Sequence, residues 1–167
     1  MEDKDTANTM PGSGKINVLS EASSKDAQTF AHSTQQQTEG SKVLRRILVV
    51  EDDASLANLE ADILTAQGYV VAIANNGEIA ITALLQSMPD LVVLDLELPG
   101  TLTGWDVLQA LRTHARIPVL LTTSLGTAVR KQIRTRGETR LTLDHLPKPY
   151  PMQTFLKRIK RMLTIAP

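Results

Sequence analysis

The chain has 167 residues, with 18 basic and 18 acidic side chains and no cysteine. The balanced charge gives no overall field that would attract nucleic acid or an anionic membrane, and the lack of cysteine excludes disulfides, zinc–thiolate sites and thiol catalysis. No apolar run approaches the roughly 18–20 residues of a membrane-spanning helix, and the charged first ten residues do not resemble a secretory signal. We therefore expect a cytoplasmic protein with one domain and an extension.

Residues 1–42 differ in composition from the remainder of the chain. They are rich in Ser, Thr, Gln and charged residues, and Phe30 is their one aromatic residue. Such a segment cannot bury enough apolar surface to offset the loss of chain entropy on folding. We expect a disordered N-terminal tail, with a segment that folds on a partner as the alternative, followed by a single domain over residues 43–167.

Five short apolar runs rich in Val, Ile and Leu follow the tail, over residues 46–50, 69–74, 91–95, 117–123 and 141–146. Runs with so little polar alternation are typical of strands that are buried on both faces. The intervals between these runs have the apolar periodicity of helices. The apolar positions of the first helix are Leu56, Leu59, Ile63 and Leu64, and Gly68 closes it. Those of the other four lie within residues 79–85, within residues 105–111, at Val129 and Ile133 in a helix over about 126–136, and within residues 155–163. Strand and helix alternate five times, so we predict an α/β fold, a doubly wound five-stranded parallel sheet with right-handed crossovers.

Polar side chains follow or end four of these five runs. In chain order they are Glu51, Asp52 and Asp53, then Asp95, then Thr122, Thr123 and Ser124, and finally Lys148. Because ligands bind outside the carboxyl ends of the strands in such sheets, we expect these side chains to converge at one edge. Each has a simpler interpretation when taken alone, and for Asp53 we favour that simpler role, a cap on the first helix. Together, at successive strand ends, they indicate a site.

The residue types at this edge suit phosphoryl transfer. Carboxylates that lie close together repel one another, and a hard divalent cation such as Mg²⁺ relieves that repulsion. One carboxylate can then act as a nucleophile, while the metal, a lysine and a hydroxyl neutralise the oxygens of the transferring group. On this chemistry we predict that Asp95 carries an aspartyl phosphate.

The segments ILVVEDD, LVVLDLELPG, IPVLLTTS and LPKPY, in this order, resemble the receiver domain of two-component response regulators over about residues 45–165. The resemblance implies the flavodoxin-like (βα)5 receiver fold, with Asp95 as the phosphoacceptor. It implies a Mg²⁺ cofactor and leaves Asp53 outside the site. The implied metal ligands are Glu51, Asp52, Asp95 and the backbone carbonyl of Glu97, and the implied roles of Thr123 and Lys148 are the switch hydroxyl and the lysine that pairs with the phosphate.

His145 stands three residues before Lys148, where this family usually has an aromatic switch residue. A histidine there could make the switch sensitive to pH, but we favour the simpler interpretation of a half-buried histidine.

The resemblance also implies partners and a direction of signalling. A histidine kinase or histidine phosphotransfer protein would supply the phosphoryl group, and the face formed by the fourth helix, fifth strand and fifth helix would then change shape. The domain would not be an enzyme in the usual sense, although it would promote its own phosphorylation and dephosphorylation. No output module is visible after the last helix, so we expect a stand-alone receiver that signals to a partner protein.

Charge is divided unevenly along the predicted domain. Residues 43–125 carry 4 basic and 10 acidic side chains, whereas residues 126–167 carry 10 basic and 2 acidic ones. The basic face of residues 126–161 predicts an acidic partner, and a solvated helix surface is the alternative interpretation. A homodimer is left open, and no nucleic-acid recognition motif is visible.

Two other functions fit part of this pattern. In a phosphohydrolase that forms an aspartyl phosphate, a second acid follows the nucleophile by two residues, and Asp95-Leu96-Glu97 loosely imitates this. The acidic pair Glu51-Asp52 on the first strand favours the receiver instead. A receiver-shaped interaction module that never uses phosphate is the second alternative, but none of the acids, the hydroxyl or the lysine is missing here.

Overall fold

The computed structural model describes residues 44–165, and the predicted disordered tail lies outside them. Strands and helices alternate throughout this part of the chain. The strands are β1 (Arg46–Val50), β2 (Val70–Ala74), β3 (Leu91–Asp95), β4 (Val119–Thr123) and β5 (Leu143–Pro147). The helices are α1 (Ala54–Ala66), α2 (Gly77–Gln86), α3 (Gly104–His114), α4 (Gly126–Thr135) and α5 (Met152–Ile165).

The five strands form one parallel sheet in the order β2-β1-β3-β4-β5, which confirms the predicted doubly wound fold. The chain moves outward from β1 to β2 and then crosses back over β1 to β3. The order therefore reverses between β1 and β3, and a crevice for ligands is expected at the carboxyl ends of these two strands.

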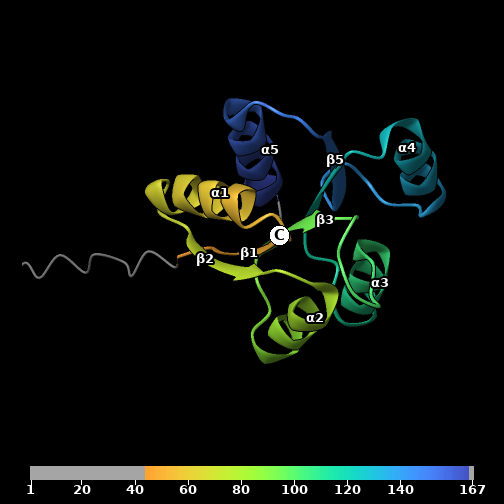
Figure 1. Ribbon diagram of the computed structural model, residues 1–167. Coiled ribbons are helices and arrows are strands. Elements are labelled where there is room, and N and C mark those ends of the chain that lie inside the picture. Colours follow the sequence, from red (N-terminus) through yellow and green to blue (C-terminus); the bar gives the residue numbers. More distant parts are fainter. Residues whose placement is uncertain (1–43, 166–167) are drawn as a thin grey trace, which may run out of the picture. The chain divides into compact units, whose positions relative to one another are not determined.

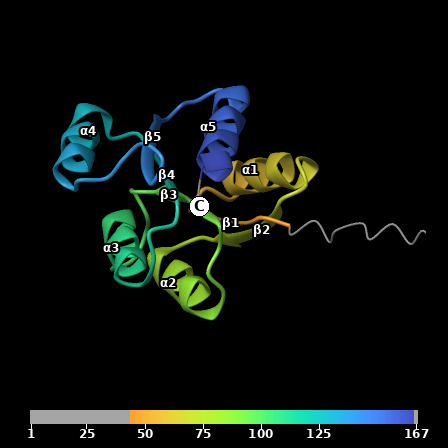
Figure 2. The same ribbon diagram turned by 180° about the vertical axis from the view of Figure 1, so that it is seen from behind.

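Helices cover both faces of the sheet. Figure 1 shows α1 and α5 on one side and α2 and α3 on the other, and Figure 2 shows the same layers from behind. Alternate residues of each central strand point into different cores because the side chains of a strand alternate between its faces. One core joins Val92 and Leu94 to α2, α3 and α4, and the other joins Leu91 and Val93 to α1 and α5.

Two sequence predictions about burial need correction. The run that forms β2 is largely exposed, with Val70 and Ile73 at 46% and 42%, because β2 is an edge strand of the sheet. Leu59 was assigned to the apolar stripe of the first helix, but it is 47% exposed, and the buried positions of α1 are Ala57, Glu60 and Leu64. The distribution of apolar residues along α1 therefore did not predict correctly which side of this helix packs against the sheet.

The start and end of α1 follow the local sequence. Asp53 caps the helix as predicted, because its carboxylate accepts hydrogen bonds from the backbone N–H groups of Ser55 and Leu56 at 2.8 and 3.1 Å. After Gln67 the chain turns through Gly68, whose φ of 84° is readily adopted only by glycine. The cap turns the Asp53 side chain toward the backbone of α1, while Glu51 and Asp52 remain beside the sheet edge.

Candidate functional site

Three carboxylates meet at the carboxyl ends of β1 and β3. Val50 pairs with Leu94, so the residues that follow them, Glu51 and Asp95, leave neighbouring strand ends together. Glu51, Asp52 and Asp95 each place a carboxylate oxygen within 4.8 Å of the other two. Glu51 and Asp95 are buried, at 2% and 3% exposure, whereas Asp52 is exposed. The cluster thus consists of two buried carboxylates and one that is exposed to solvent.

Lys148 is the cation of this cluster. Its Nζ lies 2.7 Å from Glu51 Oε2 and 2.5 Å from Asp95 Oδ2. The lysine is held there because its backbone N–H donates to the carbonyl of Thr123 at 3.0 Å, continuing the β4–β5 ladder. The Lys148–Pro149 peptide bond is cis. Lys148 therefore links the ends of three strands.

Burial and charge pairing shift the pKa values of Glu51 and Lys148 in opposite directions. Burial raises the pKa of Glu51, although its hydrogen bond to Lys148 partly opposes this. Burial alone would lower the pKa of Lys148, but hydrogen bonds and charge pairing with Asp95 and Glu51 outweigh it, so that pKa lies above its ordinary value. Lys148 consequently keeps its positive charge at neutral pH.

The carboxylate of Asp95 is oriented by donors on both of its oxygens. Oδ2 accepts from Lys148, and Oδ1 accepts from the backbone N–H of Glu97 at 2.9 Å. Gly104 packs directly against this turn, since a Cβ atom there would lie 2.1 Å from the carbonyl oxygen of Asp95. The close approach of Gly104 to the backbone of Asp95 becomes visible only in the fold.

Thr123 and Glu97 form the opposite rim of the site. The Thr123 hydroxyl donates to Glu97 Oε2 at 3.2 Å, and the backbone N–H of Ser124 donates to the same oxygen at 3.0 Å. Thr122 precedes Thr123 on β4, so its side chain lies on the other face of the sheet, and its buried Oγ1 lacks a hydrogen-bond partner among the described residues. Thr123 is therefore the threonine whose hydroxyl lies at this rim, and its role as the switch hydroxyl stays a prediction.

The donor set fits a Mg²⁺ ion. Mg²⁺ prefers oxygen ligands and keeps several waters, so two or three carboxylates with one of them open to solvent are sufficient. Glu51, Asp52 and Asp95 would supply these oxygens, and Lys148 neutralises only part of their combined charge. The backbone carbonyl of Glu97 stays a prediction as a further ligand.

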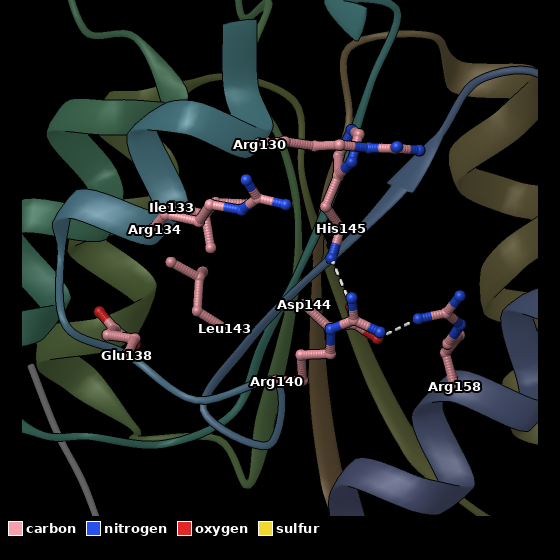
Figure 3. Close-up of a pocket in the computed structure, with 9 residues that line it drawn as sticks. All are labelled: Arg130, Ile133, Arg134, Glu138, Arg140, Leu143, Asp144, His145 and Arg158. Carbon is pink, nitrogen blue, oxygen red and sulfur yellow. Dashed lines mark hydrogen bonds and ion pairs between the residues drawn. The ribbon is translucent and has the colours of Figure 1, made fainter. Parts of the chain in front are cut away.

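His145 lies on β5 between α4 and α5, as Figure 3 shows. Its ring is half-buried, and Nε2 has no hydrogen-bond partner among residues 44–165. Burial, followed by the charge of Arg130, holds the pKa of His145 below its ordinary value. The ring is half-buried, as the favoured interpretation of the sequence expected, and a role of His145 in the switch stays a prediction.

A second buried acid lies near the site and was missed by the sequence analysis. Glu60 on α1 is fully buried, and Tyr150, two residues after Lys148, donates a hydrogen bond to its Oε1. Burial raises the pKa of Glu60 to about 7. The sequence could have indicated the burial of Glu60 through its spacing, because Glu60 stands three residues after Ala57 and four before Leu64, on the inward face of α1.

The sequence profile described as the response regulator receiver domain matches residues 47–160. The DNA-binding response regulator MtrA of Mycolicibacterium paratuberculosis is 35% identical over 119 residues, which are 71% of this chain and 51% of that protein. The probable transcriptional regulatory protein SilR of Salmonella typhimurium is 36% identical over 119 residues, or 71% of this chain and 50% of its own. This chain thus spans about half the length of the curated relatives it matches.

Solved structures show the same similarity. The chemotaxis protein CheY4 of Vibrio cholerae has a TM-score of 0.63 at 26% identity, over 71% of this chain and 98% of that one. The N-terminal domain of a response regulator/sensory box/GGDEF protein from Carboxydothermus hydrogenoformans has a TM-score of 0.63 at 29% identity, over 72% and 95%. No helix among residues 44–165 is both long and apolar enough to cross a membrane.

Proposed function

Because this chain belongs to the response regulator receiver domain family of two-component signalling, we propose that Asp95 accepts a phosphoryl group in a Mg²⁺-dependent reaction. The donor is a phosphohistidine of a histidine kinase or a histidine phosphotransfer protein. One observation carries the proposal. The Asp95 carboxylate is buried, held by Lys148 and the N–H of Glu97, and lies beside two further acids.

The proposed reaction is an in-line transfer. An oxygen of Asp95 attacks the phosphorus, the bond from phosphorus to the donor imidazole breaks, and the electron pair leaves with the imidazole nitrogen. Lys148, which already contacts Asp95, pairs with a phosphoryl oxygen. Mg²⁺, when bound, supplies positive charge to the other phosphoryl oxygens.

The signal would leave the site through Thr123. Its hydroxyl now donates to Glu97, and the same hydroxyl would donate to the phosphoryl group once Asp95 is modified. Movement of Thr123 would change the space beside His145 on the neighbouring strand β5 and bias the α4–β5–α5 face toward a second arrangement. Phosphorylation at the carboxyl end of β3 would thereby change the surface at the β5 edge of the sheet.

The output is proposed to reach an acidic downstream protein through the basic face of residues 126–161. We place this exchange in the cytoplasm, where the kinase presents its phosphohistidine. Action as a stand-alone receiver and formation of a homodimer stay predictions. The DNA-binding activity named for MtrA belongs to that protein, of which this chain spans about half.

The proposal is tested by intact mass after incubation with Mg²⁺ and a small acyl phosphate donor. Wild type is expected to gain one phosphoryl group, about 80 Da, that hydroxylamine removes. Asp95→Asn and wild type in EDTA are expected to gain nothing. Asp53→Asn is the matched control, because asparagine still caps α1 and Asp53 lies outside the acidic cluster.

Three results would contradict the proposal. A phosphoryl group on Asp95→Asn would place the acceptor elsewhere. Rapid turnover of a phosphomonoester would favour the hydrolase. A folded wild type that neither gains mass nor binds beryllium fluoride would favour an interaction module that works without phosphate.

A further inference from the structure

A concave site of about 440 Å³ lies between α4, β5 and α5, and none of the acidic cluster's residues lines it. This volume is within the range of roughly 300–1,000 Å³ that holds small ligands. Figure 3 shows Arg130 and Arg134 on the α4 side of the hollow and Arg158 on the α5 side, and Arg140 completes its set of arginines. We call this site the arginine hollow.

The two acids that line the arginine hollow are already paired. Glu138 binds Arg112 through both carboxylate oxygens, at 2.8 and 2.7 Å. Asp144 forms ion pairs with Arg158 and Arg161.

Three guanidinium groups consequently remain without an acid. Among the ion pairs of residues 44–165, none involves Arg130, Arg134 or Arg140. Three like charges around one hollow repel each other, and a ligand with two or more negative charges would relieve this repulsion.

The chemistry of the hollow favours phosphate. Arginine presents a planar fork of donors that matches phosphate oxygens in a bidentate manner. The half-buried side chain of Ile133 provides an apolar surface, with the buried Leu143 beneath it, and the ring of His145 stands beside it. An apolar surface next to convergent cations suits a molecule with a flat ring and phosphate groups.

The acidic partner proposed above is expected to contact basic side chains outside the hollow, such as Lys131 and Lys157, because a protein segment fits the hollow itself less well. Protein interfaces are centred on large apolar or aromatic anchors. Among the described residues of α4, β5 and α5 with their flanking loops, Leu125 is the single large hydrophobic side chain that is exposed, and it lies at the start of α4 outside the hollow.

We propose that the arginine hollow binds a small phosphate-bearing ligand of the nucleotide class, whose phosphates contact Arg130, Arg134 and Arg140 and whose ring packs on Ile133. The ligand would lie beside His145, in the path by which phosphorylation is proposed to reach the surface. Binding itself does not require phosphorylation of Asp95, so the two proposals can fail separately.

The test is isothermal titration of the full chain with ATP and with inorganic pyrophosphate, in EDTA so that the acidic cluster holds no metal. Saturable binding is expected in wild type and in Asp95→Asn alike. Arg130→Ala/Arg134→Ala is expected to weaken ATP binding by about tenfold or more, since it removes two forked donors. The matched control is Lys131→Ala/Lys157→Ala, which removes the same charge from exposed positions outside the hollow.

A second measurement reports the place of binding. In NMR titrations, ATP should raise the pKa of His145, because a bound anion would offset the charge of Arg130. Burial is the largest cause that lowers the pKa of this histidine; of the charged groups that face it, Arg130 from α4 and Arg158 from α5 also lower the pKa, and Asp144 from β5 raises it. Arg130→Ala/Arg134→Ala should abolish the ATP-induced change.

Four outcomes would overturn the proposal. They are no saturable binding of either probe, an equal loss of affinity in the lysine control, binding of ATP that leaves His145 unchanged, and tighter binding of hexaglutamate than of ATP. The last result would assign the hollow to an acidic protein segment. Circular dichroism of each variant verifies that it is folded before its affinity is compared.

Discussion

Glu60→Gln tests how the buried acid on α1 affects stability. Glu60 has no exposed surface, Tyr150 donates to its Oε1, and its Oε2 has no hydrogen-bond partner within residues 44–165. Glutamine has the same shape and keeps an oxygen that accepts from Tyr150, but it cannot ionise. The pH dependence of the difference in stability between the two proteins therefore isolates the energetic effect of ionising Glu60.

The magnitude follows from the pKa of Glu60, which burial raises from 4.5 to about 7. The folded state holds this proton more tightly than the unfolded chain does. The stability it contributes is fully present below about pH 4.5 and is lost as the pH rises through about 7. Since a tenfold difference in proton affinity is worth about 1.4 kcal/mol, the whole contribution is about 3 kcal/mol.

Urea unfolding of wild type and Glu60→Gln across this pH range measures the contribution directly. From about pH 5 to about pH 8, wild type should lose roughly 2–3 kcal/mol of stability relative to Glu60→Gln. Glu78→Gln is the control, because Glu78 is exposed and its hydrogen bond to Thr101 holds its pKa below the ordinary value. Parallel pH profiles for wild type and Glu60→Gln would refute the reasoning.

Two further substitutions test contacts that only the fold reveals. Gly104→Ala should lower the free energy of unfolding in urea by about 2–3 kcal/mol, because the new Cβ meets the carbonyl oxygen of Asp95 at 2.1 Å. Gly126→Ala, where a Cβ meets nothing within 4 Å, should leave stability unchanged or raised, and equal losses would argue against the clash. Arg112→Ala should reduce the same free energy by about 3 kcal/mol, because its partner Glu138 is only 5% exposed and would lose both hydrogen bonds. Arg45→Ala, which breaks an exposed ion pair, should cost less than about 1 kcal/mol, and a similar loss in both variants would contradict the difference in burial.

The sequence by itself determined the architecture of this domain. Uninterrupted apolar runs such as Leu91–Leu94 indicate strands covered on both faces, and alternation with helices leaves a parallel sheet as the consistent arrangement. Because the carboxyl ends of parallel strands share one edge, the positions of Glu51, Asp95 and Lys148 in the chain were sufficient to predict that they meet. Local rules such as the Asp53 cap also held, since they involve only neighbouring residues.

Only the tertiary structure decided which residues each element buries. Leu59 and Glu60 are adjacent on α1, yet the leucine is exposed and the glutamate is buried, because the rotation of α1 against the sheet depends on distant side chains. The hydrogen bond between Thr123 and Glu97 and the pairing of Glu138 with Arg112 likewise join residues 26 apart. Burial and charge pairing are set by neighbours in space, so the raised pKa of Glu60 and the unpaired charge of the arginine hollow could not be predicted from spacing along the chain.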